Sequence, residues 1–88
     1  MKYKLTHHFK QRVLNRTPYD DIESFKMDVK NKLGCVVEVT NTTNKKMYRR
    51  LDYKFRTQPD SVYWVIDWMR IAIVVSQDRK TWITLINL

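Results

Sequence analysis

The stretch VYWVIDWMRIAIVVSQDRKTWITLINL, residues 62–88, contains three runs that are rich in β-branched and aromatic side chains. Runs of this composition between polar turn residues are typical of β-strands. We therefore expect strands over 62–66, 70–75 and 81–88, with the turn SQDRK at 76–80 joining the last two. Because short connections favour antiparallel neighbours, this stretch predicts the centre of a β-sheet.

The segment upstream of these runs also has the character of strands. The run CVVEV at 35–39 is rich in β-branched residues, and the turn residues TNTTN follow it at 40–44. Apolar and polar residues alternate from Lys46 onward, which predicts a longer strand with one apolar face. The apolar positions of that strand are Met47, Leu51, Tyr53 and Phe55. Arg49 falls on the same face and interrupts it, which makes Arg49 a candidate functional residue.

The N-terminal third predicts two helices. The first spans about 6–16, because apolar residues recur there at steps of four with neither Gly nor Pro between them. These residues are Leu5, Phe9 and Val13. A second helix is expected from Thr17 onward, with Thr17 as its N-cap and Pro18 at its first position. Its apolar stripe is Ile22, Phe25, Val29 and Leu33, and Gly34 follows as a stop signal.

This order of elements predicts an α+β fold. We expect two N-terminal helices packed on one face of a four- to five-stranded antiparallel sheet. The opposite face of the sheet is then open to solvent or to a ligand. The chain of 88 residues is long enough for one hydrophobic core and too short for two, which predicts a single domain over 1–88.

The composition favours a polyanionic partner. Seventeen Lys and Arg against nine Asp and Glu give a formal net charge of +8. Such a charge attracts polyanions over long distances and strengthens binding by counterion release, so nucleic acid is the leading candidate. The alternative is a basic protein whose charge serves no specific partner.

The remaining composition narrows the compartment and the chemistry. Cys35 is the only cysteine, so an intramolecular disulfide is impossible, and no zinc-binding spacing is present. The N-terminal sequence at 1–10 lacks the apolar core of a signal peptide, and the longest apolar run, at 71–75, is too short to span a bilayer. We expect a cytoplasmic protein without a metal, cofactor or membrane partner.

His8, Arg12 and Arg16 form a row on the first predicted helix. Residues four apart stand above one another, so this row borders the apolar ridge of the helix. Histidine exchanges protons near neutral pH, and arginine presents a fork of donors that matches phosphate oxygens. The row suits metal-independent cleavage of RNA, in which a 2′-hydroxyl is the nucleophile. The alternative is the solvated border of an ordinary amphipathic helix.

The sequences LTHHFKQRVLNR at 5–16 and KTWITL at 80–85 resemble the RelE-like ribonuclease toxin superfamily, which includes phage endoribonucleases and small toxin-like domains. The resemblance implies cleavage of RNA, commonly messenger RNA, with no metal and with a cyclic phosphate product. It gives His8 the proton-transfer role and matches Thr84 to a threonine of the last strand. Residues 18–33 contain no second histidine, so the sheet must supply the missing group.

Two sets of candidate site residues follow. The candidate catalytic residues are His8, Arg12, Arg49 and Thr84. The candidate RNA-binding residues are Arg16, Arg50, Arg70, Arg79, Lys80 and Tyr48, which offer positive charge or a phenolic proton donor.

Three functions compete at this point. The first is a metal-independent endoribonuclease that acts as a toxin or phage regulator and has RNA, and an antitoxin, as partners. The second is a non-catalytic nucleic-acid binder that stacks bases on exposed Trp64, Trp82 or Tyr residues. The third is a small protein that inhibits a host protein through an apolar patch at 62–69. Core packing is the alternative role for those aromatic residues and for 62–69.

Overall fold

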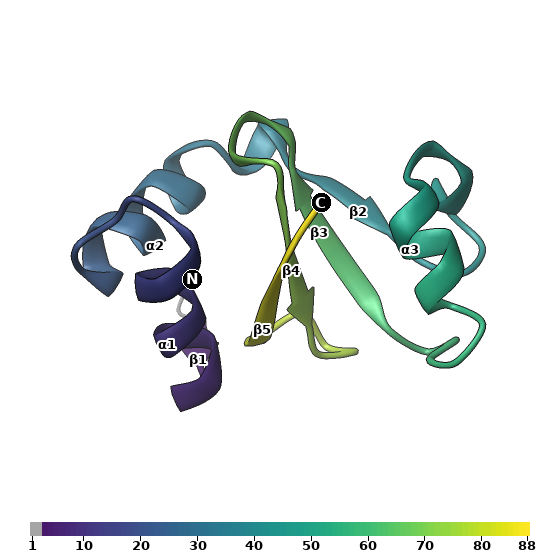
Figure 1. The fold of residues 1–88 in the computed structure, drawn as a ribbon, viewed down its shortest axis with the longest axis horizontal. Coiled ribbons are helices and arrows are strands. Elements are labelled where there is room, and N and C mark those ends of the chain that lie inside the picture. The colour runs from purple at the N-terminus through teal and green to yellow at the C-terminus, as the bar shows by residue number, and fades with distance from the viewer. Residues whose placement is uncertain (1–2) are drawn as a thin grey trace.

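The computed structural model describes residues 3–88, so the first two residues of the predicted domain lie outside the described residues. Residues 3–88 form a five-stranded sheet and three α-helices (Figure 1). The strands are β1 (Lys4–Leu5), β2 (Val37–Val39), β3 (Val62–Ile66), β4 (Ile71–Val75) and β5 (Thr81–Asn87). The helices are α1 (His7–Arg16), α2 (Ile22–Asn31) and α3 (Arg49–Lys54). Short 3-10 turns cover Leu33–Cys35, Lys45–Met47 and Asp67–Met69.

The sheet has the strand order β1-β5-β4-β3-β2. Strands β3, β4 and β5 form the antiparallel centre that the stretch 62–88 predicts. The edge strand β1 pairs with β5 in parallel, through Lys4 opposite Thr81 and Leu5 opposite Trp82. The α+β class is therefore confirmed, whereas the prediction of a purely antiparallel sheet is wrong. A strand of two residues has no periodicity from which its pairing could be predicted.

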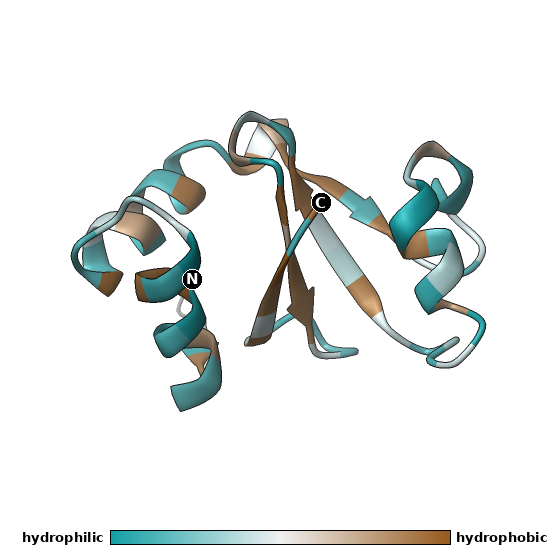
Figure 2. Cartoon of the chain, in the orientation of Figure 1, coloured by the Kyte–Doolittle hydropathy of each residue, from teal (hydrophilic) through white to brown (hydrophobic). Residues whose placement is uncertain are grey.

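One side of the sheet, here called the α1/α2 face, carries a large aromatic core. Trp82 of β5 is fully buried, and its ring stacks on Tyr3 at 5.0 Å between centroids. Phe9 of α1 and Phe25 of α2 approach the same indole edge-on, at 5.6 and 6.4 Å. The buried residues of both helices, which the periodicity of the sequence predicts, thus pack against Trp82. Figure 2 shows the hydrophobic residues gathered on the strands between the helices.

The other side of the sheet, here called the α3 face, is covered by α3 rather than open. Leu51 is fully buried and Phe55 is 4% exposed, and both pack against Tyr63, Val65 and Ala72 of the sheet. The long strand predicted from Lys46 is therefore wrong, and so is the expectation that this face is open, whereas the two predicted N-terminal helices do share one face. Leu51 and Phe55 are four residues apart. This spacing places them on one side of a helix, and it would also place them on one face of a strand. Met47 and Tyr53, two apolar positions of the predicted strand, are exposed. This fits a helix buried at Leu51 and Phe55 and does not fit a strand with one buried apolar face.

The second helix begins later than predicted. Asp21 is the N-cap of α2, and its carboxylate accepts hydrogen bonds from the Ser24 backbone N–H at 2.8 Å and from the Ser24 hydroxyl at 2.9 Å. Thr17 instead ends α1, because its N–H and its hydroxyl both donate to the Val13 carbonyl. Thr17 suits a cap by residue type, but its hydroxyl bonds to α1, and a carboxylate such as Asp21 is favoured at the positive end of a helix.

Candidate functional site

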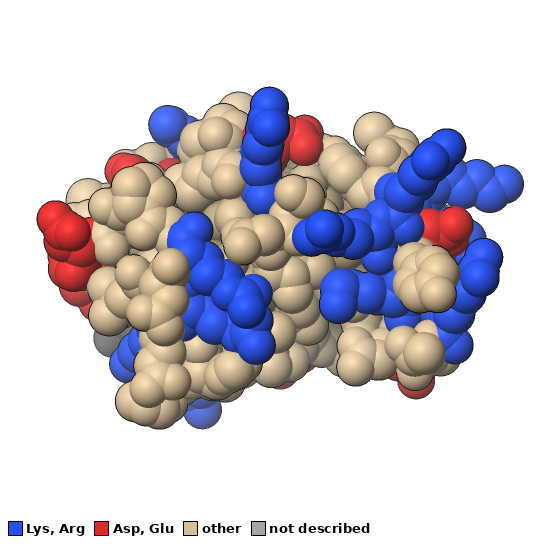
Figure 3. Space-filling view, in the orientation of Figure 1, with Lys and Arg blue, Asp and Glu red and all other residues tan. Residues whose placement is uncertain are grey.

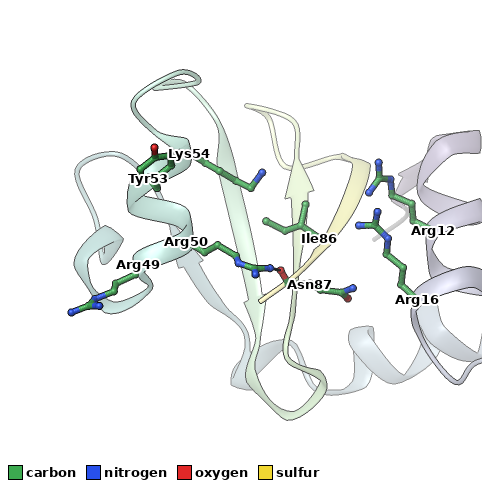
Figure 4. Close-up of a pocket in the computed structure, with 8 residues that line it drawn as sticks. All are labelled: Arg12, Arg16, Arg49, Arg50, Tyr53, Lys54, Ile86 and Asn87. Carbon is green, nitrogen blue, oxygen red and sulfur yellow. Dashed lines mark hydrogen bonds between the residues drawn. The ribbon is translucent and has the colours of Figure 1, made fainter.

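An open cleft of about 800 Å³ lies between α1 and α3, over the C-terminal end of β5 (Figure 4). The residues that line it are Arg12, Arg16, Arg49, Arg50, Tyr53, Lys54, Ile86 and Asn87. Five of these eight described residues are Arg or Lys, and none is acidic. Residues 17–48 separate the two helices in the sequence, so the cleft exists only in the folded chain.

The wall formed by α1 is anchored to the edge of β5. The Thr6 hydroxyl donates to the Ile83 carbonyl at 2.5 Å and accepts from the Phe9 backbone N–H, which makes Thr6 both the N-cap of α1 and a tether to β5. At the other end of α1, an Arg16 Nη donates to the Leu85 carbonyl at 3.3 Å. Arg12 and Arg16, two members of the row predicted from the sequence, extend toward β5 in Figure 4.

The wall formed by α3 reaches the same strand from the opposite side. An Arg50 Nη donates to the Asn87 carbonyl at 2.7 Å. Lys54 lies one helical turn beyond Arg50 and extends toward Ile86 in Figure 4. Arg49 also lines the cleft, but its guanidinium points away from the centre in that view. The expectation that Arg49 lies on a strand, on the apolar face, is therefore wrong: it is an exposed residue at the start of α3.

The edge of β5 explains why the arginines converge. Strand β1 pairs only with Thr81 and Trp82, so the rest of this edge has no neighbouring strand among the described residues. The alternate carbonyls of Ile83, Leu85 and Asn87 accept side-chain hydrogen bonds there instead of strand pairing. A guanidinium has five N–H donors, so an arginine that donates one of them to a carbonyl keeps others for a ligand.

The face that contains the cleft is strongly basic. Figure 3 shows two groups of Lys and Arg side chains, one over α1 and one over α3, on either side of a strip of uncharged surface. Charges of one sign on facing walls raise the local potential and the local concentration of an anionic ligand. The chemistry of this surface is therefore attraction and hydrogen bonding of anions.

His8 is exposed and does not line the cleft, but it is joined to it through Arg12. The Arg12 Nε donates to the His8 Nε2 at 2.7 Å. This bond requires a lone pair at Nε2, so the proton of the neutral imidazole lies on Nδ1. The structure thus brings together two of the four candidate catalytic residues. Arg12 is half-buried, and the hydrogen bond fixes the direction of both side chains.

Thr84 is not part of this group. It lies in the middle of β5, opposite Val74, and it does not line the cleft. Its hydroxyl oxygen is buried and has no hydrogen-bond partner among the described residues. A hydroxyl enclosed in this way does not face a ligand in the cleft.

The other predicted RNA-binding residues lie elsewhere, and two of them have acidic partners. Arg79 makes a two-pronged pair with Glu38, with an Nε to Oε1 distance of 2.9 Å, and this pair holds the pKa of Glu38 below its ordinary value. The Tyr48 hydroxyl donates to Asp67, and burial followed by the Asp67 charge raises the pKa of Tyr48. Both residues therefore connect parts of the fold.

Arg70 and Lys80 occupy turns. Arg70 has a φ of 54° in the turn before β4, rather than the strand position predicted for it, and its carbonyl accepts from the Leu88 N–H. Lys80 precedes β5, and its carbonyl accepts from the Lys4 N–H in the pairing with β1. Neither residue lines the cleft.

The two tryptophans proposed for base stacking are used by the core. Trp82 is fully buried and Trp64 is half-buried, with its Nε1 donating to Glu38 at 3.1 Å. The apolar run at 62–69 does not form a surface patch, because β3 lies between β2 and β4 and most of its side chains are buried. Trp68 is the exception in this run, at 41% exposed.

Sequence reasoning missed Tyr53 and Lys54. The alternation assigned to this segment placed Tyr53 on an apolar strand face and gave Lys54 no role. A signal was present, because Arg50 and Lys54 are four residues apart on one side of a helix whose other side carries Leu51 and Phe55.

Two findings concern other classes of site. Among residues 3–88, no group of three or more His, Cys, Asp or Glu side chains is placed to hold a metal ion. In the same part of the chain, every helix is too short or too polar to cross a membrane.

Comparison with known proteins does not extend these observations to relatives. No family model, curated protein or solved structure matches the chain.

Proposed function

We propose that the protein binds RNA through its phosphate groups in the cleft between α1 and α3. The observation that carries this proposal is the convergence of Arg12, Arg16, Arg50 and Lys54 from two helices on one strand edge, with no acidic residue in the lining. Arginine forks match the paired oxygens of a phosphate, and lysine adds a mobile point charge.

The shape of the cleft favours a polymer over a small anion. The cations are distributed over two walls and a volume of about 800 Å³ instead of closing around one point. A polynucleotide presents a phosphate at every residue and can contact both walls at once. Each contact releases counterions, so the affinity is expected to fall steeply with salt.

Fluorescence anisotropy with a labelled single-stranded oligoribonucleotide tests the proposal. The cleft variant replaces Arg12, Arg16, Arg50 and Lys54 by Gln. The control variant replaces four exposed lysines outside the cleft, Lys4, Lys10, Lys30 and Lys46, by Gln, so the net charge changes equally. If all four cleft residues contact phosphates, the slope of log affinity against log salt falls by about 3 in the cleft variant, at about 0.7 per contact.

The control variant should keep a slope close to that of the unchanged protein. Equal losses in the two variants would mean that total charge, and not the cleft, attracts RNA. Thermal unfolding of both variants checks that the bonds of Arg16 and Arg50 to β5 are not needed for folding.

A second candidate function is metal-independent cleavage of the bound RNA, as in the RelE-like ribonucleases that the α1 motif resembles. The hydrogen bond between Arg12 and His8 favours it, because it joins a proton acceptor to a cation of the cleft. The 2′-oxygen would attack phosphorus as His8 takes its proton, while Arg12 stabilises the added negative charge. A 2′,3′-cyclic phosphate forms, and the 5′-oxygen leaves with a proton from solvent.

This step requires Arg12 to move from the His8 Nε2 to the phosphate, which frees the lone pair of the base. The test is incubation of the protein with RNA in EDTA, with His8→Ala compared with His7→Ala, its exposed neighbour. Cyclic phosphate products are expected from the unchanged protein and from His7→Ala but not from His8→Ala. RNA that is bound but stays intact would leave binding as the function and exclude cleavage.

A further inference from the structure

Tyr53 is exposed in a way that packing does not explain. At 71% exposed, it is the most exposed of the large hydrophobic side chains in residues 3–88. It lies on α3 beside Leu51 and Phe55, which turn inward and hold the helix to the sheet. Because Tyr53 contributes little to that core, its aromatic ring is available to a ligand.

The surroundings of this ring are those of a nucleic-acid contact. Tyr53 lines the cleft together with Arg50 and Lys54, its neighbours on α3. The Arg56 guanidinium lies over the ring, 5.2 Å from its centroid. A cation over a phenol ring is attracted to the negative face of the ring, which helps to hold the ring in place.

We infer that Tyr53 is a stacking platform for an unpaired nucleobase, so the cleft selects single-stranded over double-stranded RNA. This inference rests on the proposed binding of RNA phosphates. A strand whose phosphates follow the cations of the cleft carries its bases within reach of an aromatic ring on the same wall. In a duplex the bases are paired and stacked on one another, so they cannot reach such a ring.

The cleft alone does not require single strands, since phosphates occur in both forms. The Tyr53 ring distinguishes single strands from duplexes, because it stacks only on an unpaired base. Every base has a π-face, so stacking tolerates any sequence. The geometry therefore points to a ligand class, single-stranded RNA of mixed sequence, and not to a particular base. An apolar contact with a protein partner is the competing role for Tyr53, and it would not depend on bases.

The experiment compares three labelled ligands of equal length. They are a single-stranded oligoribonucleotide, the same strand annealed to its complement, and an abasic ribose-phosphate oligomer. Tyr53→Ala should weaken binding of the single strand by about 5- to 150-fold, the range expected for loss of one stacked base. Its binding of the duplex and of the abasic oligomer should stay unchanged. Tyr53→Phe should retain the affinity for the single strand, because the ring and not the hydroxyl makes the contact.

Trp68→Ala is the matched control. Trp68 is also an exposed aromatic residue with a cation over its ring, Lys32 at 5.3 Å, but it does not line the cleft. Its removal should leave all three affinities unchanged.

The outcomes separate this inference from the proposed function. Unchanged binding of the single strand by Tyr53→Ala would overturn the stacking role and leave phosphate binding standing. The same holds if Tyr53→Ala loses affinity for all three ligands equally, since the abasic oligomer has no base to stack. Failure of the unchanged protein to bind any of the three would overturn the proposed function and this inference with it.

Discussion

The α1/α2 face and the α3 face of the sheet differ in how much apolar side chain covers them. On the α1/α2 face, Trp82 is surrounded by four other aromatic rings and is reached from two helices of ten residues each. On the α3 face, a helix of six residues is held mainly by Leu51 and Phe55.

The two faces of the sheet therefore have different roles, one mainly in stability and the other in binding. A helix of six residues is too short to be stable by itself, so α3 depends on its two buried side chains. Its remaining surface is free to present Arg50, Tyr53 and Lys54 to the cleft. The α1/α2 face supplies most of the stability, and α3 supplies one wall of the site at the cost of a smaller core. The comparison predicts where substitutions damage folding and where they damage binding.

The largest effect is expected from Trp82→Ala. Removal of a fully buried indole should lower the free energy of unfolding by about 4 kcal/mol, through lost burial and the cavity left behind. Urea unfolding followed by circular dichroism measures this loss. Trp82→Phe should cost less, because it keeps a ring and removes an indole N–H that has no hydrogen-bond partner among the described residues.

Trp68→Ala serves here as the exposed control and should change stability by less than about 1 kcal/mol. A small effect of Trp82→Ala would mean that the α1/α2 face is not the principal core.

The next effect is expected from Leu51→Ala on the α3 face. Loss of this buried side chain should cost about 3 kcal/mol if α3 unfolds together with the sheet. Hydrogen exchange at the backbone amides of α3 and of β4 shows whether it does. Loss of protection in α3 alone, with β4 unchanged, would mean that α3 unfolds separately from the sheet. The two faces would then differ in cooperativity as well as in core size.

The same difference decides how much of the fold could be predicted from the sequence. Strands β3, β4 and β5 and helices α1 and α2 have long, consistent patterns, because each buries a complete face. The segment containing α3 is short, and its buried residues Leu51 and Phe55 fit alternation and helical spacing equally well. Only packing against Tyr63 and Val65 selects the helix.

The site was predictable to the same extent as the elements that form it. The row on α1 follows from spacing alone, and the structure aims Arg12 and Arg16 into the cleft. Arg50 was a candidate by charge, but its bond to the Asn87 carbonyl depends on a strand edge distant in the sequence. Tyr53 could not be identified while its segment was assigned to a strand. The acidic partner of Arg79 likewise depends on the fold, because Glu38 is 41 residues away.

A smaller effect is expected from Arg79→Gln, which tests whether a charged residue outside the cleft affects folding or binding. The pair with Glu38 is partly exposed, at 38% and 43% for the two side chains, so solvent weakens it and its loss should lower the stability much less than Leu51→Ala does. The Arg79 hydrogen bonds lower the pKa of Glu38, so their stabilisation is present above pH 4.5, the ordinary value, and is lost as the pH falls through the lowered pKa. Urea unfolding as a function of pH should show the two proteins converging in acid.

RNA affinity separates this role from that of the cleft. Arg79→Gln should bind the single-stranded oligomer like Lys80→Gln, its exposed neighbour, since both change the net charge by one outside the cleft. A distinctly larger loss of affinity for Arg79→Gln would extend the binding surface to the turn before β5.

Comparably small effects are expected from two tyrosine–aspartate hydrogen bonds, one associated with each face. The Tyr19 hydroxyl donates to Asp28 of α2 at 2.6 Å, and the Tyr48 hydroxyl, next to α3, donates to Asp67 at 3.2 Å. Tyr19→Phe should cost about 1 kcal/mol, and Tyr48→Phe less, because its hydrogen bond is longer. Urea unfolding of the two variants at neutral pH measures both losses under the same conditions.

Alkaline pH distinguishes these bonds from simple packing. Burial, and then the bond to Asp28, raises the pKa of Tyr19 from 10.0 to about 12. A raised pKa means that the stabilisation is complete below pH 10 and is lost as the pH rises through 12, because the unfolded chain ionises first. The stability of the unchanged protein should therefore fall toward that of Tyr19→Phe between pH 10 and 12, while phenolate absorbance reports Tyr19 ionising late. If the difference between them stays constant over this range, the Tyr19 hydroxyl ionises alike in the folded and the unfolded chain, which would contradict the raised pKa and the contribution of the bond to Asp28.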